Sequence, residues 1–163
     1  MNNFIKKLNL KTYKVVIFAI LASCVWLYLA YTHPRNIYYS YKAMQFQIGI
    51  TGTARPVVID INGRYTNSIL GNADVFSGEI KVGNKVFDFT DKPLNFNKNK
   101  MGILVWDSSV GNAYSLIYVS PMLKELAIQT IDKYIAAPCR HRTVAVEITN
   151  TLLKNSGNNW IVK

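Results

Sequence analysis

Val15-Val-Ile-Phe-Ala-Ile-Leu-Ala-Ser-Cys-Val-Trp-Leu-Tyr-Leu-Ala-Tyr31 is the stretch around which the rest of the chain is organised. It carries no charge and only one strongly polar side chain, Ser23. As a helix rising about 1.5 Å per residue it covers roughly 26 Å, close to the hydrocarbon thickness of a bilayer once Thr32 is added. The sequence therefore predicts a transmembrane helix over residues 15–32.

Basic residues before this stretch predict its orientation. Lys6, Lys7, Lys11 and Lys14 precede it with no acidic residue among them. The positive-inside bias is most reliable close to a span, so residues 1–14 are expected to form a basic cytoplasmic tail. The predicted location is the cell membrane, with a single span, a cytoplasmic N-terminus and an extracytoplasmic C-terminal domain.

The same region also fits a processed leader. A secretory signal combines a basic segment with an apolar segment, and Leu21-Ala22-Ser23-Cys24 matches the lipobox at which bacterial lipoprotein precursors are cleaved and lipidated. The apolar run continues over residues 25–29, however, where a mature lipoprotein normally turns polar. An uncleaved span is the favoured interpretation, and lipid attachment at Cys24 is the alternative.

Composition indicates one small domain after the span. The 163-residue chain is 50% hydrophobic and 17% charged, with two cysteines. Cys24 lies in the span, so no disulfide can form within the remainder, which must be held together by its core. About 130 residues suffice for one modest core. We expect a juxtamembrane linker over residues 33–43 and an extracytoplasmic β-rich domain over residues 44–163.

Three tyrosines, Tyr38, Tyr39 and Tyr41, follow the helix-breaking Pro34. Tyrosine rings are amphipathic and sit well at the level of lipid headgroups. Two interpretations therefore stay open: an interfacial collar, or the beginning of the folded domain.

Alternation of apolar and polar residues predicts strands, most clearly over residues 44–51. Residues 56–63 repeat the alternation and stop at Asn62-Gly63, a strong turn signal. Gly83-Asn84 predicts a two-residue type II′ hairpin that sets Ile80 across from Phe87. Seven or eight short strands at such spacing indicate an antiparallel sandwich or a strongly bent sheet. Further strands are expected over residues 65–70, 75–76, 79–82, 85–89, 103–106, 114–119 and 126–131, with a polar loop over 91–100 and a turn over 107–112.

The periodicity changes after Pro138. Val144, Ile148 and Leu152 recur at four-residue steps, which predicts one amphipathic C-terminal helix that ends near residues 155–157. Its apolar stripe needs a sheet to cover, so the predicted fold class is α+β. Residues 160–162 are expected as a docked tail or as a last edge strand.

Residues 75–155 contain Gly102-Ile-Leu-Val, Leu116-Ile-Tyr-Val-Ser-Pro121, Ala136-Ala-Pro138 and Ala145-Val-Glu-Ile148. This arrangement resembles small one-span proteins of Gram-positive bacteria that have no assigned activity. The resemblance implies a location and no reaction. Cys139-Arg-His departs from that pattern.

No motif in the chain points to catalysis. Asp107-Ser-Ser-Val-Gly111 has Asp where a G-x-S-x-G elbow needs its first glycine, and it joins two predicted strands. Cys139 and His141 supply two of the four ligands that a closed zinc site needs. Asp60-Ile-Asn-Gly63 lacks the spacing and the later glutamate of a calcium loop. We therefore expect a non-enzyme without metal or cofactor.

The surplus of basic residues is the remaining functional signal, because the net charge is +10. Lys98 and Lys100 lie in one predicted loop, while Arg140 and Arg142 lie at the start of the predicted helix, whose free N–H groups can help to hold an anion. Outside a cell the available polyanions are lipid headgroups and wall polymers rather than nucleic acid. A plain solvated surface is the other interpretation of these four residues.

The function expected from the sequence is a single-pass, membrane-anchored surface protein with a non-catalytic binding or scaffolding domain. The alternatives are a lipoprotein of the same fold and an enzyme of an unrecognised class.

Overall fold

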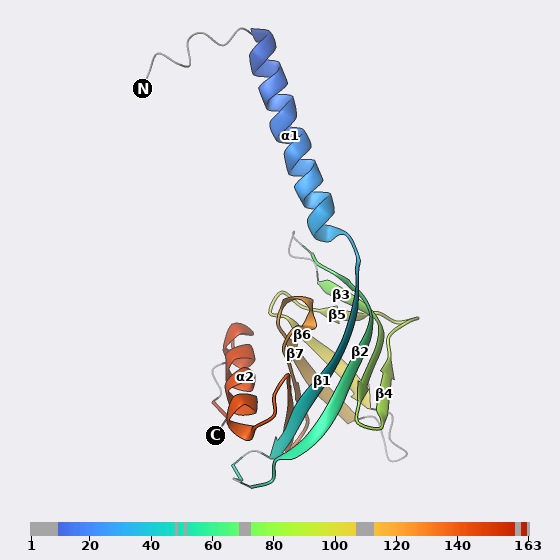
Figure 1. Cartoon of the computed structure of the whole chain (residues 1–163), viewed down its shortest axis with the longest axis vertical. Helices are drawn as coiled ribbons and strands as arrows, with labels where there is room; N and C mark the ends of the chain where they lie inside the picture. The colour runs from blue at the N-terminus through green and yellow to red at the C-terminus, as the bar shows by residue number, and fades with distance from the viewer. Residues whose placement is uncertain are drawn as a thin grey trace. The chain divides into compact units, whose positions relative to one another are not determined.

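The computed structural model of the chain describes residues 10–47, 49–50, 52–68, 73–106, 113–158 and 161–162. The chain divides into two units, Met1–His33 and Pro34–Lys163. Within the described ranges, the first unit is helix α1 (Leu10–Thr32), and the second is a nine-stranded antiparallel sheet with helix α2 (Arg142–Asn155) (Figure 1). The predicted order of an apolar helix, a β-rich domain and a C-terminal helix is confirmed.

Helix α1 carries no charged residue after Lys14. Its segment Tyr13–Thr32 has a mean hydropathy of 2.2, and none of these side chains is buried. The hydroxyl of Ser23 donates to the carbonyl of Ala19 (2.8 Å), so this polar side chain is satisfied inside the helix. By length and composition α1 fits a membrane span or a signal sequence.

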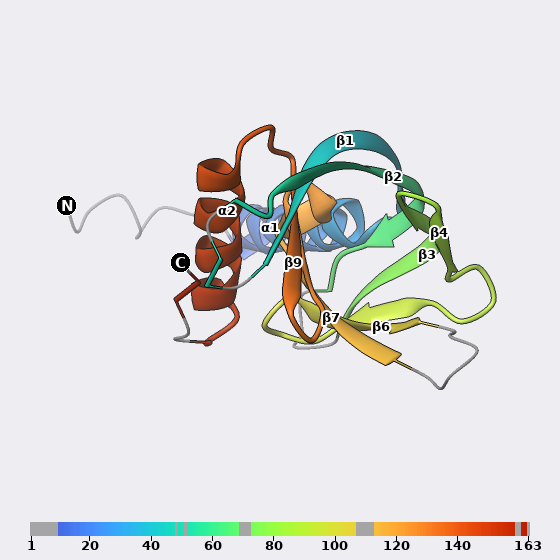
Figure 2. The same cartoon turned by 90° about the horizontal axis from the view of Figure 1, so that it is seen from below.

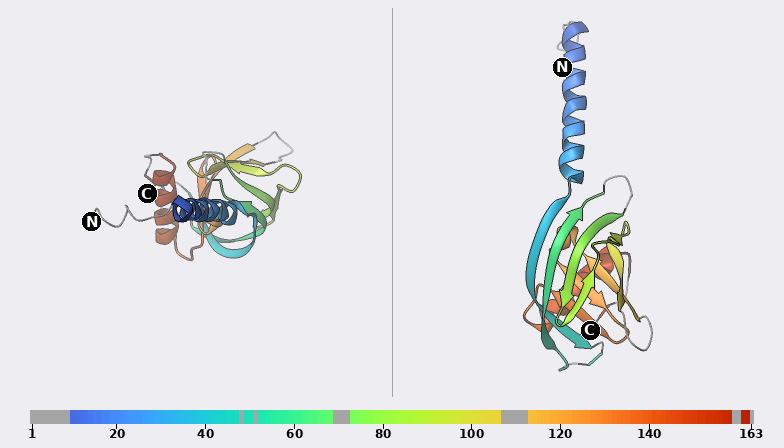
Figure 3. Two further views of the ribbon diagram at one scale, coloured as in Figure 1. Left: turned by 90° about the horizontal axis from the view of Figure 1, so that it is seen from above. Right: turned by 90° about the vertical axis from the view of Figure 1, so that its right-hand side faces the viewer.

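The sheet curls into a nearly closed barrel. Its strands follow the order β4-β3-β2-β1-β9-β8-β7-β6, and β5 pairs with the first residues of β3, while β4 pairs with the last ones. Strand β6 then comes to lie beside β5, although no ladder joins the two in the described part of the chain. The bent sheet, rather than the sandwich, is the form the domain takes (Figure 3). The strands are β1 (Arg35–Gln47), β2 (Arg55–Thr66), β3 (Asp74–Val82), β4 (Lys85–Asp88), β5 (Leu94–Phe96), β6 (Met101–Trp106), β7 (Ala113–Val119), β8 (Leu126–Gln129) and β9 (Lys133–Ala137).

The linker expected over residues 33–43 is instead mostly strand, because β1 begins at Arg35 and runs for 13 residues. Tyr39 and Tyr41 turn inward, stack with their ring centroids 5.2 Å apart and pack against the interior core. Tyr38 turns outward and stays 74% exposed. Because aromatic residues lie on both faces of β1, its sequence shows no alternation of apolar and polar residues here. Tyr39 and Tyr41 thus belong to the folded domain, as the second interpretation held.

The hairpin turn predicted at Asn62-Gly63 is wrong, since both residues lie inside β2. Gly63 pairs with Gly78 of β3, and a Cβ on Gly63 would lie 2.4 Å from the carbonyl oxygen of Ser77. Gly78 also has a φ of +143°. Glycine is therefore used here for the close approach of two backbones in a bent sheet rather than for a chain reversal.

Of the other strand predictions, one is confirmed and others need correction. The hairpin at Gly83-Asn84 is confirmed, with Gly83 at a φ of +59° and Ile80 opposite Phe87. Residues 75–76 and 79–82 belong to one strand, β3, and the loop expected over 91–100 contains the short β5. Residues 65–66 end β2 instead of starting a strand. The turn expected over 107–112 lies outside the described residues.

Two apolar cores form on opposite faces of the sheet. The interior core is filled by large, fully buried side chains, so the barrel is packed rather than hollow. The outer core lies between α2 and the outward faces of β1, β9, β8 and β7 (Figure 2). Its members from the sheet include Met44, Phe46, Tyr118, Tyr134 and Ala136.

Helix α2 is confirmed, but its buried face differs from the predicted stripe. Ile148 and Leu152 are buried, whereas Val144 is 40% exposed. A four-residue step drifts around a helix of 3.6 residues per turn, so a stripe of such steps leaves the contact face. The remaining buried residues of α2 are Ala145, Thr149 and Leu153.

The end of the chain docks beside α2. The N–H of Val162 donates to Asn150 Oδ1 (2.8 Å), and Asn150 Nδ2 donates to the carbonyl of Val162 (3.0 Å). Val162 is buried in the outer core and lies in no strand. For residues 161–162 the docked tail, not the edge strand, is the arrangement found, and residue 160 lies outside the described residues.

Candidate binding groove

A surface groove of about 860 Å³ runs between β4 and β6, where the barrel fails to close. Its β4 wall carries Val86, Phe87 and Asp88, and its β6 wall carries Ile103 and Val105. The connection between β4 and β5, together with Leu94 and Asn95, completes the lining. This lining is mainly apolar, and Asp88 is the one acidic side chain among the residues given for it.

Strand β6 presents an open edge to this groove. The N–H of Val119 donates to the carbonyl of Lys100 (3.0 Å), which makes these two opposed residues a hydrogen-bonded pair. Alternation along an antiparallel ladder then directs the backbone groups of Met101, Ile103 and Val105 away from β7. The open edge of β6 therefore begins at Met101 and faces β4 and β5.

Only the first residue of this edge is capped. The N–H of Asn97 donates to the carbonyl of Met101 (2.9 Å), and the N–H of Met101 donates to Asn97 Oδ1 (3.0 Å). Within the described ranges, no hydrogen bond uses the outward backbone groups of Ile103 or Val105. Two N–H and two C=O groups thus line the groove.

Strand β4 presents the facing edge. The N–H of Phe89 donates to the carbonyl of Gly78 (2.7 Å), and the same alternation directs the backbone of Val86 and Asp88 away from β3. The Asp88 carboxylate accepts the N–H of Thr90 (2.8 Å). Hydrogen bonding to the side chain of Thr90, and then to this N–H, lowers the pKa of the exposed acid. The groove is consequently bordered by two strand edges.

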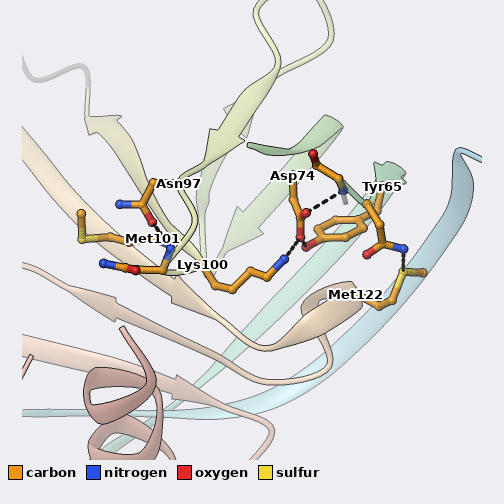
Figure 4. A network of polar contacts seen from close by, with 9 residues as sticks. Tyr65, Asp74, Asn97, Lys100, Met101 and Met122 are labelled. Atoms are coloured by element: carbon orange, nitrogen blue, oxygen red, sulfur yellow. Dashed lines mark hydrogen bonds and ion pairs between the residues drawn. The ribbon is translucent and has the colours of Figure 1, made fainter. Parts of the chain in front are cut away.

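A buried polar network centres on Asp74, which follows the groove residue Ala73 in the chain (Figure 4). Asp74, 2% exposed, accepts hydrogen bonds from the Tyr65 hydroxyl (2.5 Å) and the Ser68 N–H (2.9 Å), and it forms an ion pair with Lys100. Burial alone would raise the pKa of Asp74, but these contacts hold it below its ordinary value of 3.8. The network ties the end of β2 and the start of β3 to the turn before β6.

The four predicted anion contacts lie in two separate places, the turn before β6 and the start of α2 with the residues just before it. Lys98 is exposed in the turn between β5 and β6, and Arg140 is exposed between β9 and α2. Lys100 is committed to Asp74, and the guanidinium carbon of Arg142 lies 5.7 Å from the centre of the Phe46 ring. The structure therefore shows internal partners for Lys100 and Arg142, while anion contact by Lys98 and Arg140 stays a prediction.

The cysteine and histidine residues do not gather. Cys24 is exposed within α1, and Cys139 is buried, with its Sγ donating to the carbonyl of Ala136 (2.9 Å). Burial raises the pKa of the Cys139 thiol. His141 is exposed at the start of α2. In the described ranges, no three His, Cys, Asp or Glu side chains are grouped to hold a metal ion.

No family model, no curated protein and no solved structure matches the chain. The groove was not found from the sequence, because alternation identifies a strand and not its place at an edge. The arrangement offers apolar contacts and strand-edge hydrogen bonding, the chemistry of a site that holds an extended chain.

Proposed function

We propose that the chain is a single-pass membrane protein that displays a non-catalytic binding domain on the outer face of the cell membrane. The contrast between the two units carries this proposal. Helix α1 leaves apolar side chains uncovered along its length, whereas the barrel completes its own cores. An apolar helix of this length without protein cover is stable in a bilayer, where all its backbone groups are satisfied internally.

Charge supports the orientation. Lys6, Lys7, Lys11 and Lys14 precede the apolar segment and favour a cytoplasmic N-terminus. Beyond the segment, 15 basic residues stand against 9 acidic ones. Anionic headgroups and wall polymers attract such a domain without specificity, so we assign specific binding to the groove and not to the charge.

The non-catalytic role is supported by the chemistry of the groove. General acid–base catalysis needs positioned titratable groups, usually more than one. The lining given for the groove offers one acid, Asp88, which is exposed and bonded to its own loop. Its other features, apolar walls and strand edges, suit binding.

Labelling of intact cells with a membrane-impermeant maleimide tests the topology. In a Cys24→Ser background, Lys98→Cys is expected to react on intact cells, because Lys98 is exposed on the barrel. Lys7→Cys, the matched control on the other side of α1, is expected to react only after lysis. The opposite pattern would overturn the proposed orientation.

Mass spectrometry of the unaltered chain separates the anchor types. An intact N-terminal tail on protein that stays with membranes after alkaline washing supports the span. A mature N-terminus at a lipid-modified Cys24 would replace the span with the lipoprotein alternative. Release of the protein from the membrane at alkaline pH contradicts both.

A further inference from the structure

We propose that the groove takes an extended segment of a partner protein, which adds to the open edge of β6 as a further strand. This inference rests on the proposed binding function of the domain. It names the class of ligand, a polypeptide in β conformation, and the strand that receives it.

The open edge of β6 is the first argument. Ile103 and Val105 point their N–H and C=O groups into the groove, and their side chains are 53% and 49% exposed. Natural proteins usually protect an exposed edge with lysine, proline or a bulge, because an apolar edge pairs readily with another chain. Ile103 and Val105 carry none of these protections. A strand is the ligand whose alternating donors and acceptors match theirs.

The size of the groove is the second argument. A strand residue occupies about 3.3 Å along the chain, about 4.8 Å across to its neighbour and about 10 Å through the sheet, or roughly 160 Å³. The groove, at about 860 Å³, is therefore large enough for a short extended segment of a few residues.

The lining predicts the character of the segment. Side chains beside Ile103, Val105 and Val86 meet apolar neighbours and are expected to be apolar or β-branched. Lys85 and Lys92 stand in the same lining against the single acid Asp88. An acidic residue flanking the apolar positions is therefore favoured over a basic one.

A second copy of the chain fits this edge less well. Two copies joined through β6 about a two-fold axis would run antiparallel. Strand β6 runs in the same direction as β1, so one of the two barrels would be inverted. Its Arg35 end would then lie at the far end of the pair, although in each copy Arg35 follows α1 by three residues. The two Arg35 ends of such a pair would thus lie at opposite ends of the joined strands, and a partner segment is favoured.

Selection from a displayed library of random peptides, about nine residues long, tests the inference. The full chain in lipid nanodiscs is the target, and selected peptides are then measured by fluorescence anisotropy. We expect binding to weaken at least tenfold with Ile103→Pro and with peptides N-methylated at alternate residues. Ile103→Pro removes an N–H that points away from β7, so the ladder to β7 is kept.

A second variant and a control variant test whether weaker binding comes from the edge of β6. Val105→Lys places a charge on the same edge without altering the backbone and is expected to weaken binding in the same way. Ile131→Lys is the control, because Ile131 is 93% exposed in the turn between β8 and β9 and does not line the groove. It should leave binding unchanged.

Selected peptides that bind Ile103→Pro and Val105→Lys as tightly as the unaltered chain would overturn strand addition at β6. A library that yields no binder would overturn a polypeptide ligand. Neither result touches the membrane topology, which the labelling experiment decides separately.

Discussion

The two sides of the barrel carry similar outward side chains but differ in what covers them. On the side of β1, β9, β8 and β7, outward residues such as Phe46 and Tyr134 are buried beneath α2. On the side of β4 and β6, Val86, Ile103 and Val105 are about half exposed. Figure 2 shows α2 on the first side and β4 on the other. Outward apolar residues are thus buried where α2 packs on the sheet and half exposed on the other side.

The largest effect is expected from shortening β1, a strand of the covered side that pairs with both β2 and β9. Residues 34–163 made without α1 should fold and give a circular dichroism spectrum dominated by β structure. Residues 44–163 should show no cooperative unfolding, because they lack the pairing of Arg35–Ala43 with β2. Equal midpoints of thermal unfolding for the two fragments would mean that the first half of β1 does not stabilise the domain.

Truncation beneath α2 comes next. Ile148→Ala and Leu153→Ala each remove a buried side chain and should lower the free energy of unfolding by about 2–5 kcal/mol. Glu147→Ala and Lys154→Ala, on the exposed face, should change it by about 0.5 kcal/mol or less. Denaturant unfolding of the full chain measures both. If Ile148→Ala leaves the free energy of unfolding unchanged, the packing of α2 does not stabilise the domain. The covered side would then resemble the open one.

The polar network of Tyr65, Asp74 and Lys100 should have a smaller effect that depends on pH. Asp74→Asn removes the charge that Lys100 pairs with and should cost about 1–3 kcal/mol at neutral pH. Because the pKa of Asp74 is lower in the folded state, its contribution is complete above its ordinary value of 3.8 and is lost as the pH falls further. The difference in stability between Asp74→Asn and the unaltered chain should therefore narrow at acidic pH. A difference that stays constant with pH would assign the loss to packing instead.

The smallest effect is expected on the open side. Ile103→Ser should change the free energy of unfolding by about 0.5 kcal/mol or less, since half of this side chain already contacts solvent. Thermal unfolding beside Ile148→Ala gives the comparison directly. A loss for Ile103→Ser as large as that for Ile148→Ala would show that the groove wall belongs to the core.

Local patterns made half of the fold predictable. The hairpin at Gly83-Asn84 and the helix after Pro138 depend on residues close in sequence, and both were predicted with the right type. The first half of β1 was missed because tyrosines on both faces remove the alternation. The turn predicted at Asn62-Gly63 was wrong because the same dipeptide occurs both in tight turns and where two strands approach closely.

The candidate site was out of reach for a different reason. Lys100 meets Asp74 across 26 positions of sequence, and no local signal pairs them. The groove exists because β4 and β6, which β5 separates in sequence, come together without pairing. The ion pair and the groove both form only when the whole sheet closes, so no local sequence pattern predicts them.

The crossing of Gly63 and Gly78 has a consequence for how relatives of this chain could be traced. A side chain at either position would collide with backbone, so neither glycine can drift while the bend is kept. Divergence can replace most surface residues and exchange core residues of similar volume. Two glycines fifteen positions apart, each inside an alternating strand, should therefore persist as a family signature after overall sequence identity has faded.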